Sequence, residues 1–322
     1  MTEPVSIDVV VCTYDNVASL ELVLGALARQ AVPADVDWGV LVVDNNCTDG
    51  TPALLERLRA EGALPLRVVL ETVQGLTPAR RRGVAETSRD WVAFVDDDCV
   101  VSEDWVAQAA AVARERPAAG GFGGVVALEW ERDPPGYVER HPWAYAHQDH
   151  GPLAKPVPSL AGAGMVLRRA ALVRSGWTEQ QLLADRVGHR LISGGDVEIA
   201  LRVAAEHELW FDPRLRLRHL IPARRTTPRH LAALTYGLGT SKLLGDSMLW
   251  RGSYRGWVAR SLRDSLPFAR MALAALRHGQ LVDAAADASF LRGWLAGIWR
   301  LRRADPAWRR ALLGAAAPAR PG

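Results

Sequence analysis

The sequence contains few cysteines and no cysteine pairs. Cys12, Cys47 and Cys99 are the three in 322 residues, and none of them stands in a Cys-x-x-Cys spacing. This pattern excludes a disulfide framework and a zinc site built from paired cysteines. We expect three reduced thiols that pack at strand ends in a cytoplasmic protein.

Long apolar runs are also missing. No stretch approaches the ~18 consecutive apolar residues that a membrane-spanning helix needs. The first residues, MTEPVSIDVVVCTYDN, have no basic region ahead of a long apolar one, so we expect no signal peptide. Both observations indicate a cytoplasmic protein without a membrane span.

The glycine motifs that cradle phosphates are absent as well. Neither GxGxxG nor GxxxxGK[ST] follows the first apolar segment, which excludes a dinucleotide-binding fingerprint and a P-loop. What the first hundred residues do contain is an alternation of apolar, β-branched segments with segments of helical spacing. The predicted strands are 7–12, 38–44, 65–71 and 91–96, and the predicted helices are 18–30, 51–62 and 77–88. This order favours an α/β protein with a parallel sheet covered on both faces.

Polar clusters follow three of these strands, namely TYDN, DNNCTDGT and DDD. Ligands of parallel α/β sheets bind outside the carboxyl ends of the strands, where these clusters fall. Three adjacent aspartates repel one another unless a cation neutralises them. Because carboxylate oxygens suit Mg²⁺ or Mn²⁺, we expect a nucleotide that is held partly through a divalent metal on its diphosphate.

Six segments occur in the order found in family 2 glycosyltransferases: VVVCTYDN, VLVVDNNCTDGT, QGLTPARRRGV, WVAFVDDDCVV, GAGMVLRRAAL and ISGGDVEIALRV. The resemblance covers about residues 5–225. It implies an inverting enzyme that uses a nucleotide-sugar, with a GT-A fold: a Rossmann-like, largely parallel mixed sheet between helices. We therefore expect a GT-A domain over 1–225, with its nucleotide-binding half at about 1–100 and its acceptor half at about 101–225. A basic helical extension would occupy 226–322.

The resemblance assigns five residues to the donor. Asp96 matches the first aspartate of the DxD element, which approaches the ribose, and Asp98 matches the last, which binds the metal. Asp44 matches the aspartate that hydrogen-bonds uracil, and Thr13 would line the same pocket. Arg80 matches an arginine that contacts the base or the phosphates.

Simpler structural roles exist for these donor-side residues. An aspartate at a helix start is a favourable cap, although one would suffice for that purpose. Asp44 stands in a turn-forming sequence, and for Asn45, Asn46 and Asp49 we favour turn formation over ligand binding.

On the acceptor side, Asp196 matches the catalytic base of the family's Gly-Glu-Asp element, while Gly195 replaces the glutamate. His219 stands where related enzymes have a histidine that can approach the metal or the diphosphate. The small residues of 159–172 would allow close approach of a sugar, or form an ordinary glycine turn. The structural alternatives are a helix cap for Asp196, a first-turn carboxylate for Glu198, and a purely structural histidine.

The (Q/R)xxRW element of processive members is absent, which favours transfer of a single sugar over polymer synthesis. Two departures keep a second hypothesis open, a catalytically impaired module that binds a nucleotide-sugar or glycan. The first is Gly195, in place of the glutamate. The second is Arg81, which stands where the family's Ala-Arg-Asn element has asparagine. We expect a nucleotide-sugar and a glycan or lipid-linked acceptor as partners, and no nucleic acid.

The charge of the chain is uneven. Residues 251–322 contain 13 Arg and 4 Asp, hence +9, and since the whole chain carries +3 the first 250 residues carry −6. Within the basic part, 288–303 places aromatic and aliphatic residues at helical spacing with arginines beside them. Such a helix suits the surface of an anionic membrane, as a peripheral contact near a lipid-linked acceptor. The alternative is a helix packed on the catalytic domain.

Overall fold

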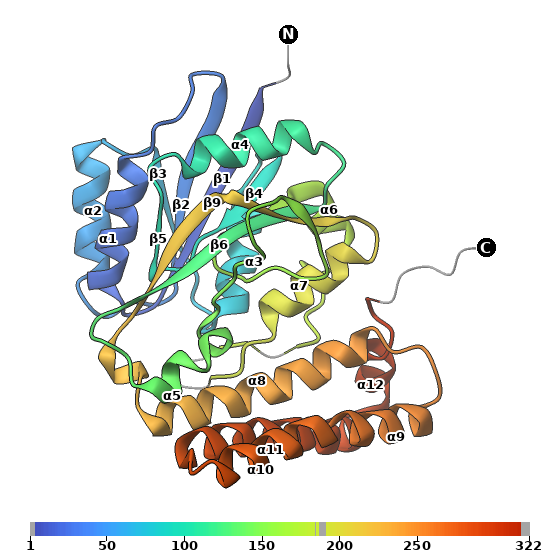
Figure 1. Ribbon diagram of the computed structural model, residues 1–322. Coiled ribbons are helices and arrows are strands. Elements are labelled where there is room, and N and C mark those ends of the chain that lie inside the picture. The colour runs from blue at the N-terminus through green and yellow to red at the C-terminus, as the bar shows by residue number, and fades with distance from the viewer. Residues whose placement is uncertain (1–3, 184, 187–190, 317–322) are drawn as a thin grey trace.

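The computed structural model describes residues 4–183, 185–186 and 191–316, and its centre is one mixed sheet (Figure 1). Within these residues the sheet has nine strands in the order β3-β2-β1-β4-β8-β6-β9-β5, and β7 pairs with β9. The strands are β1 Val5–Thr13, β2 Val36–Asp44, β3 Leu66–Leu70, β4 Trp91–Phe94, β5 Cys99–Val101, β6 Gly121–Trp130, β7 Lys155–Val157, β8 Met165–Arg168 and β9 Leu209–Ile221.

The first four strands run parallel, as the sequence predicts. Beyond them the sheet is mixed, because β8 is antiparallel to both β4 and β6 while β6 runs parallel to β9. The expected fold class, a mixed α/β sheet with a helical C-terminal region, is therefore confirmed.

Helices cover both faces of the sheet. One apolar core contains Ile7, Val9 and Val11 of β1 together with the inward residues of α1, α2 and α4. The other contains Val10 of β1 with residues of α3, α6 and α7. Successive residues of β1 thus point to opposite cores, as strand geometry requires. The bounds are α1 Val17–Ala28, α2 Thr51–Glu61, α3 Leu76–Glu86, α4 Trp105–Glu115, α5 Gly136–Glu139, α6 Arg169–Arg174 and α7 Gly195–Ala204.

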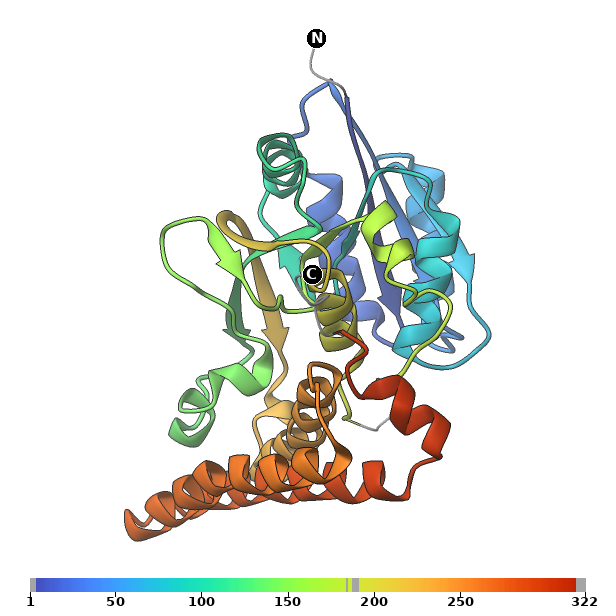
Figure 2. The ribbon, with the colours of Figure 1, turned by 90° about the vertical axis from the view of Figure 1, so that its right-hand side faces the viewer.

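The C-terminal part forms a helical layer below the sheet domain (Figure 2). Its helices are α8 Pro228–Met248, α9 Tyr254–Asp264, α10 Leu266–Arg277, α11 Leu281–Arg303 and α12 Pro306–Leu312. α8 and α11 pack so closely that a Cβ at Gly239 would lie 2.1 Å from the Phe290 carbonyl oxygen. The Thr240 hydroxyl crosses the same contact and donates to the Gly293 carbonyl at 2.9 Å. Among the described helices, none is both long and apolar enough to cross a membrane.

The apolar stripe of 288–303 lies largely inside this layer. Phe290, Trp294 and Leu301 are buried, and the Trp294 indole donates to the Ser261 carbonyl at 2.8 Å. These buried side chains pack mainly on neighbouring helices of the same layer, chiefly α8 and α10, so the helix is packed but not chiefly on the predicted catalytic domain. Two residues beside the stripe, Leu295 and Trp299, stay exposed.

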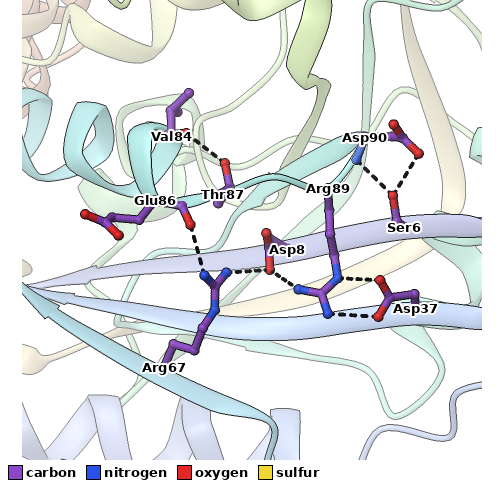
Figure 3. Close-up of polar contacts among 9 residues, drawn as sticks. All are labelled: Ser6, Asp8, Asp37, Arg67, Val84, Glu86, Thr87, Arg89 and Asp90. Atoms are coloured by element: carbon purple, nitrogen blue, oxygen red, sulfur yellow. Dashed lines mark hydrogen bonds and ion pairs between the residues drawn. The ribbon is translucent and has the colours of Figure 1, made fainter.

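An ion network ties the amino ends of the parallel strands together (Figure 3). Asp8 of β1 is fully buried, and its Oδ1 accepts from Arg89 at 2.7 Å and from Arg67 at 2.9 Å. Arg89 also pairs with Asp37 of β2 at 2.8 Å. A buried carboxylate is tolerated when cationic donors neutralise it, so this network is structural.

We expect Asp8→Asn to lower the free energy of unfolding by about 2–3 kcal/mol, because it leaves the two guanidinium groups without their shared anion. Urea denaturation measures the change. The matched control is Asp35→Asn, which breaks an exposed pair with Arg114 and should cost no more than about 0.5 kcal/mol. Equal effects of the two variants would contradict a structural role for the network.

Candidate active site

The carboxyl ends of the central strands bring the predicted donor residues together. Thr13 ends β1 directly beside Asp44, which ends β2, and the three aspartates follow β4 on the other side of β1. The Thr13 hydroxyl donates to Asp97 Oδ2 at 2.8 Å, and Asn16 donates to Asp97 Oδ1 at 3.0 Å. Burial, with the adjacent charge of Asp98, raises the pKa of Asp97 to about 7. The middle aspartate therefore links the aspartate cluster to the loop after β1.

Asp98 lies against two cationic side chains. β5 pairs with β9 so that Cys99 is opposite His219, which places the His219 Nε2 3.4 Å from Asp98 Oδ2. Arg225 donates to the same oxygen at 2.9 Å. Burial would raise the pKa of Asp98, but the charges of His219 and Arg225 outweigh it and hold the pKa well below its usual range. These groups supply positive charge to the otherwise repulsive cluster.

Asp98 and His219 have the chemistry of a metal-binding pair. The His219 Nδ1 lies 2.9 Å from the Tyr145 carbonyl oxygen, which can only accept, so Nδ1 carries a proton. Nε2 faces the Asp98 carboxylate at 3.4 Å, and a divalent cation that displaces the Nε2 proton would be held by both groups. A carboxylate oxygen and an imidazole nitrogen fit Mn²⁺ or Mg²⁺. The Cys99 thiol lies close to Asp98 and His219. Burial raises the pKa of this thiol well above the ordinary value, so Cys99 stays protonated and is a poor metal ligand.

Arg80 of α3 lies between Asp96 of the aspartate cluster and two carboxylates from the second half of the chain, Asp185 and Asp196. Its buried guanidinium lies 3.1 Å from Asp96 and 3.7 Å from Asp185. Burial alone would lower the pKa of Arg80, but the charges of Asp96, Asp185 and Asp196 outweigh it and raise the pKa. Arg80 is therefore a permanent cation among three carboxylates.

Asp196 lies in the first turn of α7 and faces this arginine. A Cβ at Gly162 would lie 2.9 Å from the Asp196 Oδ2 and 3.1 Å from an Arg80 terminal nitrogen. The small residue of the GAGM segment thus makes room for Asp196 and Arg80. The structure brings the predicted base and the predicted donor arginine to one place. Asp196 is half-buried.

Glu198 of α7 has a structural role. It is completely buried, accepts from the backbone N–H groups of Leu182 and Leu183, and pairs with Arg202 at 2.7 Å. These bonds use both carboxylate oxygens. Glu198 anchors the segment ahead of α7, which is more than the first-turn carboxylate that the sequence suggests.

The loop after β2 shows the expected turn chemistry. Asp44 Oδ1 accepts from the Cys47 N–H at 2.8 Å, and Asp49 accepts from the N–H groups of Val17 and Thr51. Asn45 does more than form a turn, because it is buried and its side chain also bonds to the segment ahead of α3. The predicted contact of Asp44 with a base stays a prediction.

The three cysteines are unpaired, and Arg81 and Arg82 bond to groups other than the aspartates. Cys12, Cys47 and Cys99 are free thiols, and burial raises the pKa of Cys12 and of Cys47 to about 12. The Arg81 guanidinium donates to the Glu179 carbonyl at 3.2 Å. Arg82 pairs with Glu86 on the outer face of α3.

Sequence patterns missed two of the charged residues in this site. Arg225 is hidden in the PARR segment after β9, one of many arginine-rich stretches. Asp185 lies ten positions before Gly195 in a segment without helix or strand periodicity. Only the fold brings either residue beside the aspartates.

The sequence also matches the model of a known protein family. The sequence model described as glycosyl transferase family 2 matches residues 8–175, more than half of the chain. The chain belongs to glycosyl transferase family 2, as its motifs predict.

Two relatives and one solved structure illustrate the range of similarity. The succinoglycan biosynthesis protein ExoM of Rhizobium meliloti is 34% identical over 123 residues, which is 38% of this chain and 40% of ExoM. A glucosyl-dolichyl phosphate glucuronosyltransferase of Haloferax volcanii is 24% identical over 74% of this chain and 77% of its own. The mannosyltransferase PcManGT of Pyrobaculum calidifontis, solved with GDP-Man and Mn²⁺, is 18% identical, with a TM-score of 0.59 over 91% of this chain and 87% of that one. The match thus spans less than half of ExoM. The likeness to PcManGT supports the fold.

Proposed function

We propose that this protein is an inverting glycosyltransferase that moves one sugar from a nucleoside diphosphate sugar, with UDP favoured, to an acceptor hydroxyl. One observation carries the proposal. A single buried guanidinium, that of Arg80, lies between Asp96 on the donor side and Asp196 on the acceptor side. This arrangement suits a reaction in which a sugar passes between the two sides.

In the proposed reaction Asp196 accepts the proton of the acceptor hydroxyl. The acceptor oxygen forms a bond to the anomeric carbon while the bond from that carbon to the diphosphate oxygen breaks on the opposite face. The configuration therefore inverts. The leaving diphosphate carries the electron pair away, and Arg80 and Arg225 are the cations at hand to stabilise it.

Asp98 and His219 would hold the divalent cation, Mn²⁺ or Mg²⁺. When bound, such an ion supplies positive charge to the departing diphosphate. Arg225, which donates to Asp98 Oδ2 at 2.9 Å, would add a second positive charge beside the diphosphate. That PcManGT was solved with GDP-Man and Mn²⁺ supports a metal-dependent donor site of this kind.

One feature of the sheet and the names of two relatives bear on the donor and the acceptor. Asp44, at the end of β2 next to Thr13, favours a uracil ring. The name of the H. volcanii relative, a glucosyl-dolichyl phosphate glucuronosyltransferase, supports a lipid-linked acceptor. ExoM, a succinoglycan biosynthesis protein, supports a role in making a glycan.

A donor panel tests the proposal. UDP-glucose, UDP-glucuronic acid, UDP-N-acetylglucosamine and GDP-mannose are incubated with the protein, with MnCl₂ or with EDTA, and release of nucleoside diphosphate is measured. We expect one donor to be hydrolysed in the presence of Mn²⁺ and not in EDTA, with the freed sugar inverted at its anomeric carbon by NMR. Tight donor binding without any release would favour the alternative of an impaired binding module.

We also propose that the protein lies at the cytoplasmic face of a membrane, through α10. Four large apolar residues of this helix, which lies at the lower edge of Figure 1, are about half exposed: Leu266, Met271, Leu273 and Leu276. Arg270 and Arg277 of the same helix are exposed beside them. Apolar residues flanked by arginines fit an anionic lipid surface, where each arginine adds about 1 kcal/mol.

Sedimentation with vesicles of phosphatidylglycerol and phosphatidylcholine measures this contact. We expect binding at low salt that weakens as salt is added, and a loss of at least ~10-fold in affinity for Leu273→Glu combined with Leu276→Glu. Leu22→Glu is the matched control, since Leu22 is an equally exposed leucine on α1. A wild-type protein that stays in the supernatant at low salt would contradict the proposal.

A further inference from the structure

The position of the missing glutamate is filled by another carboxylate. A Cβ at Gly195 would lie 2.1 Å from Asp185 Oδ2 and 3.0 Å from the Thr77 hydroxyl. No side chain other than hydrogen fits at position 195 while Asp185 is in place. The Asp185 carboxylate therefore occupies the space that the first atoms of a side chain at position 195 would need.

Bonds to two helices fix this part of the chain. Glu198 of α7 binds the N–H groups of Leu182 and Leu183, and the Arg186 carbonyl accepts from the Leu76 N–H at the start of α3 at 3.1 Å. The Asp185 Oδ1 accepts from the Arg186 N–H at 2.9 Å. Asp185 is thus held from both sides, and its Oδ2 accepts from the Thr77 hydroxyl at 3.4 Å on the side that faces Arg80.

The charges around Asp185 show what its carboxylate does. Its Oδ2 lies 3.7 Å from the Arg80 guanidinium, the cation that also faces Asp96 and Asp196. Burial and the charge of Asp196 raise the pKa of Asp185, while Arg80 opposes them. If Asp185 were absent, the Arg80 guanidinium would lose one of its three carboxylate neighbours. It could then form a direct ion pair with Asp196. A full ion pair would weaken Asp196 as a proton acceptor.

We propose that Asp185 is a positioning residue for sugar transfer, which supplies from the preceding segment the carboxylate that position 195 lacks. It holds Arg80 back from Asp196 and so keeps the base available to the acceptor hydroxyl. The inference rests on the proposed transferase function. It also gives a physical reason for the glycine at position 195, because Asp185 occupies the space of a side chain there. The carboxylate of the family's glutamate is then replaced from another position, so Gly195 does not imply an impaired module.

The first test is Asp185→Asn, which keeps the shape of the side chain and removes its charge. With the donor that the panel identifies, or UDP-glucose if the panel shows several, we expect kcat to fall by ~10-fold or more while the donor KM changes by less than about twofold. A role confined to folding would not separate kcat from KM in this way. Asp90→Asn, an exposed carboxylate paired with Ser6 at the far end of the sheet, is the control and should leave both constants unchanged.

The second test exchanges the two positions. Gly195→Glu alone should lose activity and melting temperature, because its side chain collides with Asp185. Asp185→Gly alone should lose activity. The double variant restores a carboxylate with room around it, so we expect it to exceed each single variant by at least ~10-fold in kcat and to recover the melting temperature lost by Gly195→Glu.

The outcomes separate the two proposals. An inactive wild type in the donor panel rejects the transferase, whereas an active wild type with an equally active Asp185→Asn rejects the role of Asp185. A double variant no better than either single variant also rejects it, because the carboxylate is then not interchangeable between the positions. If Asp185→Gly fails to fold, the asparagine variant still decides.

Discussion

Asp196→Asn is expected to lower turnover by ~10²-fold or more and to leave donor affinity nearly intact. The amide has the size of the carboxylate but cannot accept the proton of the acceptor hydroxyl. Asp196 lies in the first turn of α7 beside Arg80, whereas a different pair, Asp98 and His219, would bind metal and diphosphate. Loss of the base should therefore appear in kcat, measured as sugar transfer or donor hydrolysis, and not in UDP binding measured by calorimetry.

Glu198→Gln is the informative comparison for this variant. Glu198 holds Leu182 and Leu183 and pairs with Arg202, so its replacement should lower the melting temperature more than Asp196→Asn does. Turnover retained in Asp196→Asn would place the base elsewhere, and Asp185 would then be the next carboxylate to test.

Asp98→Ala should abolish Mn²⁺-dependent binding of UDP and leave the fold intact. The substitution removes the carboxylate that faces His219 Nε2, and a single imidazole is a weak site for a hard divalent cation. Removing Asp98 relieves its repulsion of Asp96 and Asp97, which offsets part of what the lost pairs with His219 and Arg225 contribute, so the chain should still fold. Calorimetric titration of UDP, with Mn²⁺ and with EDTA, measures the effect.

Asp246→Ala is a suitable control for Asp98→Ala. It removes an exposed carboxylate that pairs with Lys242 on α8, and it should leave the Mn²⁺-dependent affinity for UDP unchanged. An unaltered affinity in Asp98→Ala itself would refute the assignment of this aspartate to the metal.

The first half of the fold follows from local sequence patterns, whereas the second half does not. β1, β2 and β4 are continuous apolar segments between helices, and their parallel pairing follows from that alternation. β9 spans thirteen residues in which arginines alternate with leucines, and it pairs with β5, β6 and β7. Which strand lies beside which is set by long-range packing that no local pattern contains.

Some residues of the candidate site could likewise be predicted from local sequence motifs, and others could not. Asp96, Asp98 and Asp196 belong to recognisable motifs, and the structure brings Asp96 and Asp196 to one arginine and Asp98 to His219. Asp185 could not be found from its neighbours in the chain, because its role depends on empty space beside Gly195. A departure from a motif, such as a glycine in place of a glutamate, is the signal to search the fold for a substitute.

The state of the cysteines makes this protein convenient for chemical labelling. The thiolate is the form that attacks maleimide, and Cys12, Cys47 and Cys99 are all held as neutral thiols by burial, with Cys12 and Cys47 at a pKa of about 12. The native chain should therefore react slowly at neutral pH. A cysteine introduced at Leu276 on the exposed face of α10 would be the dominant reactive group. An environment-sensitive dye attached there would report directly whether that face leaves water when vesicles are added.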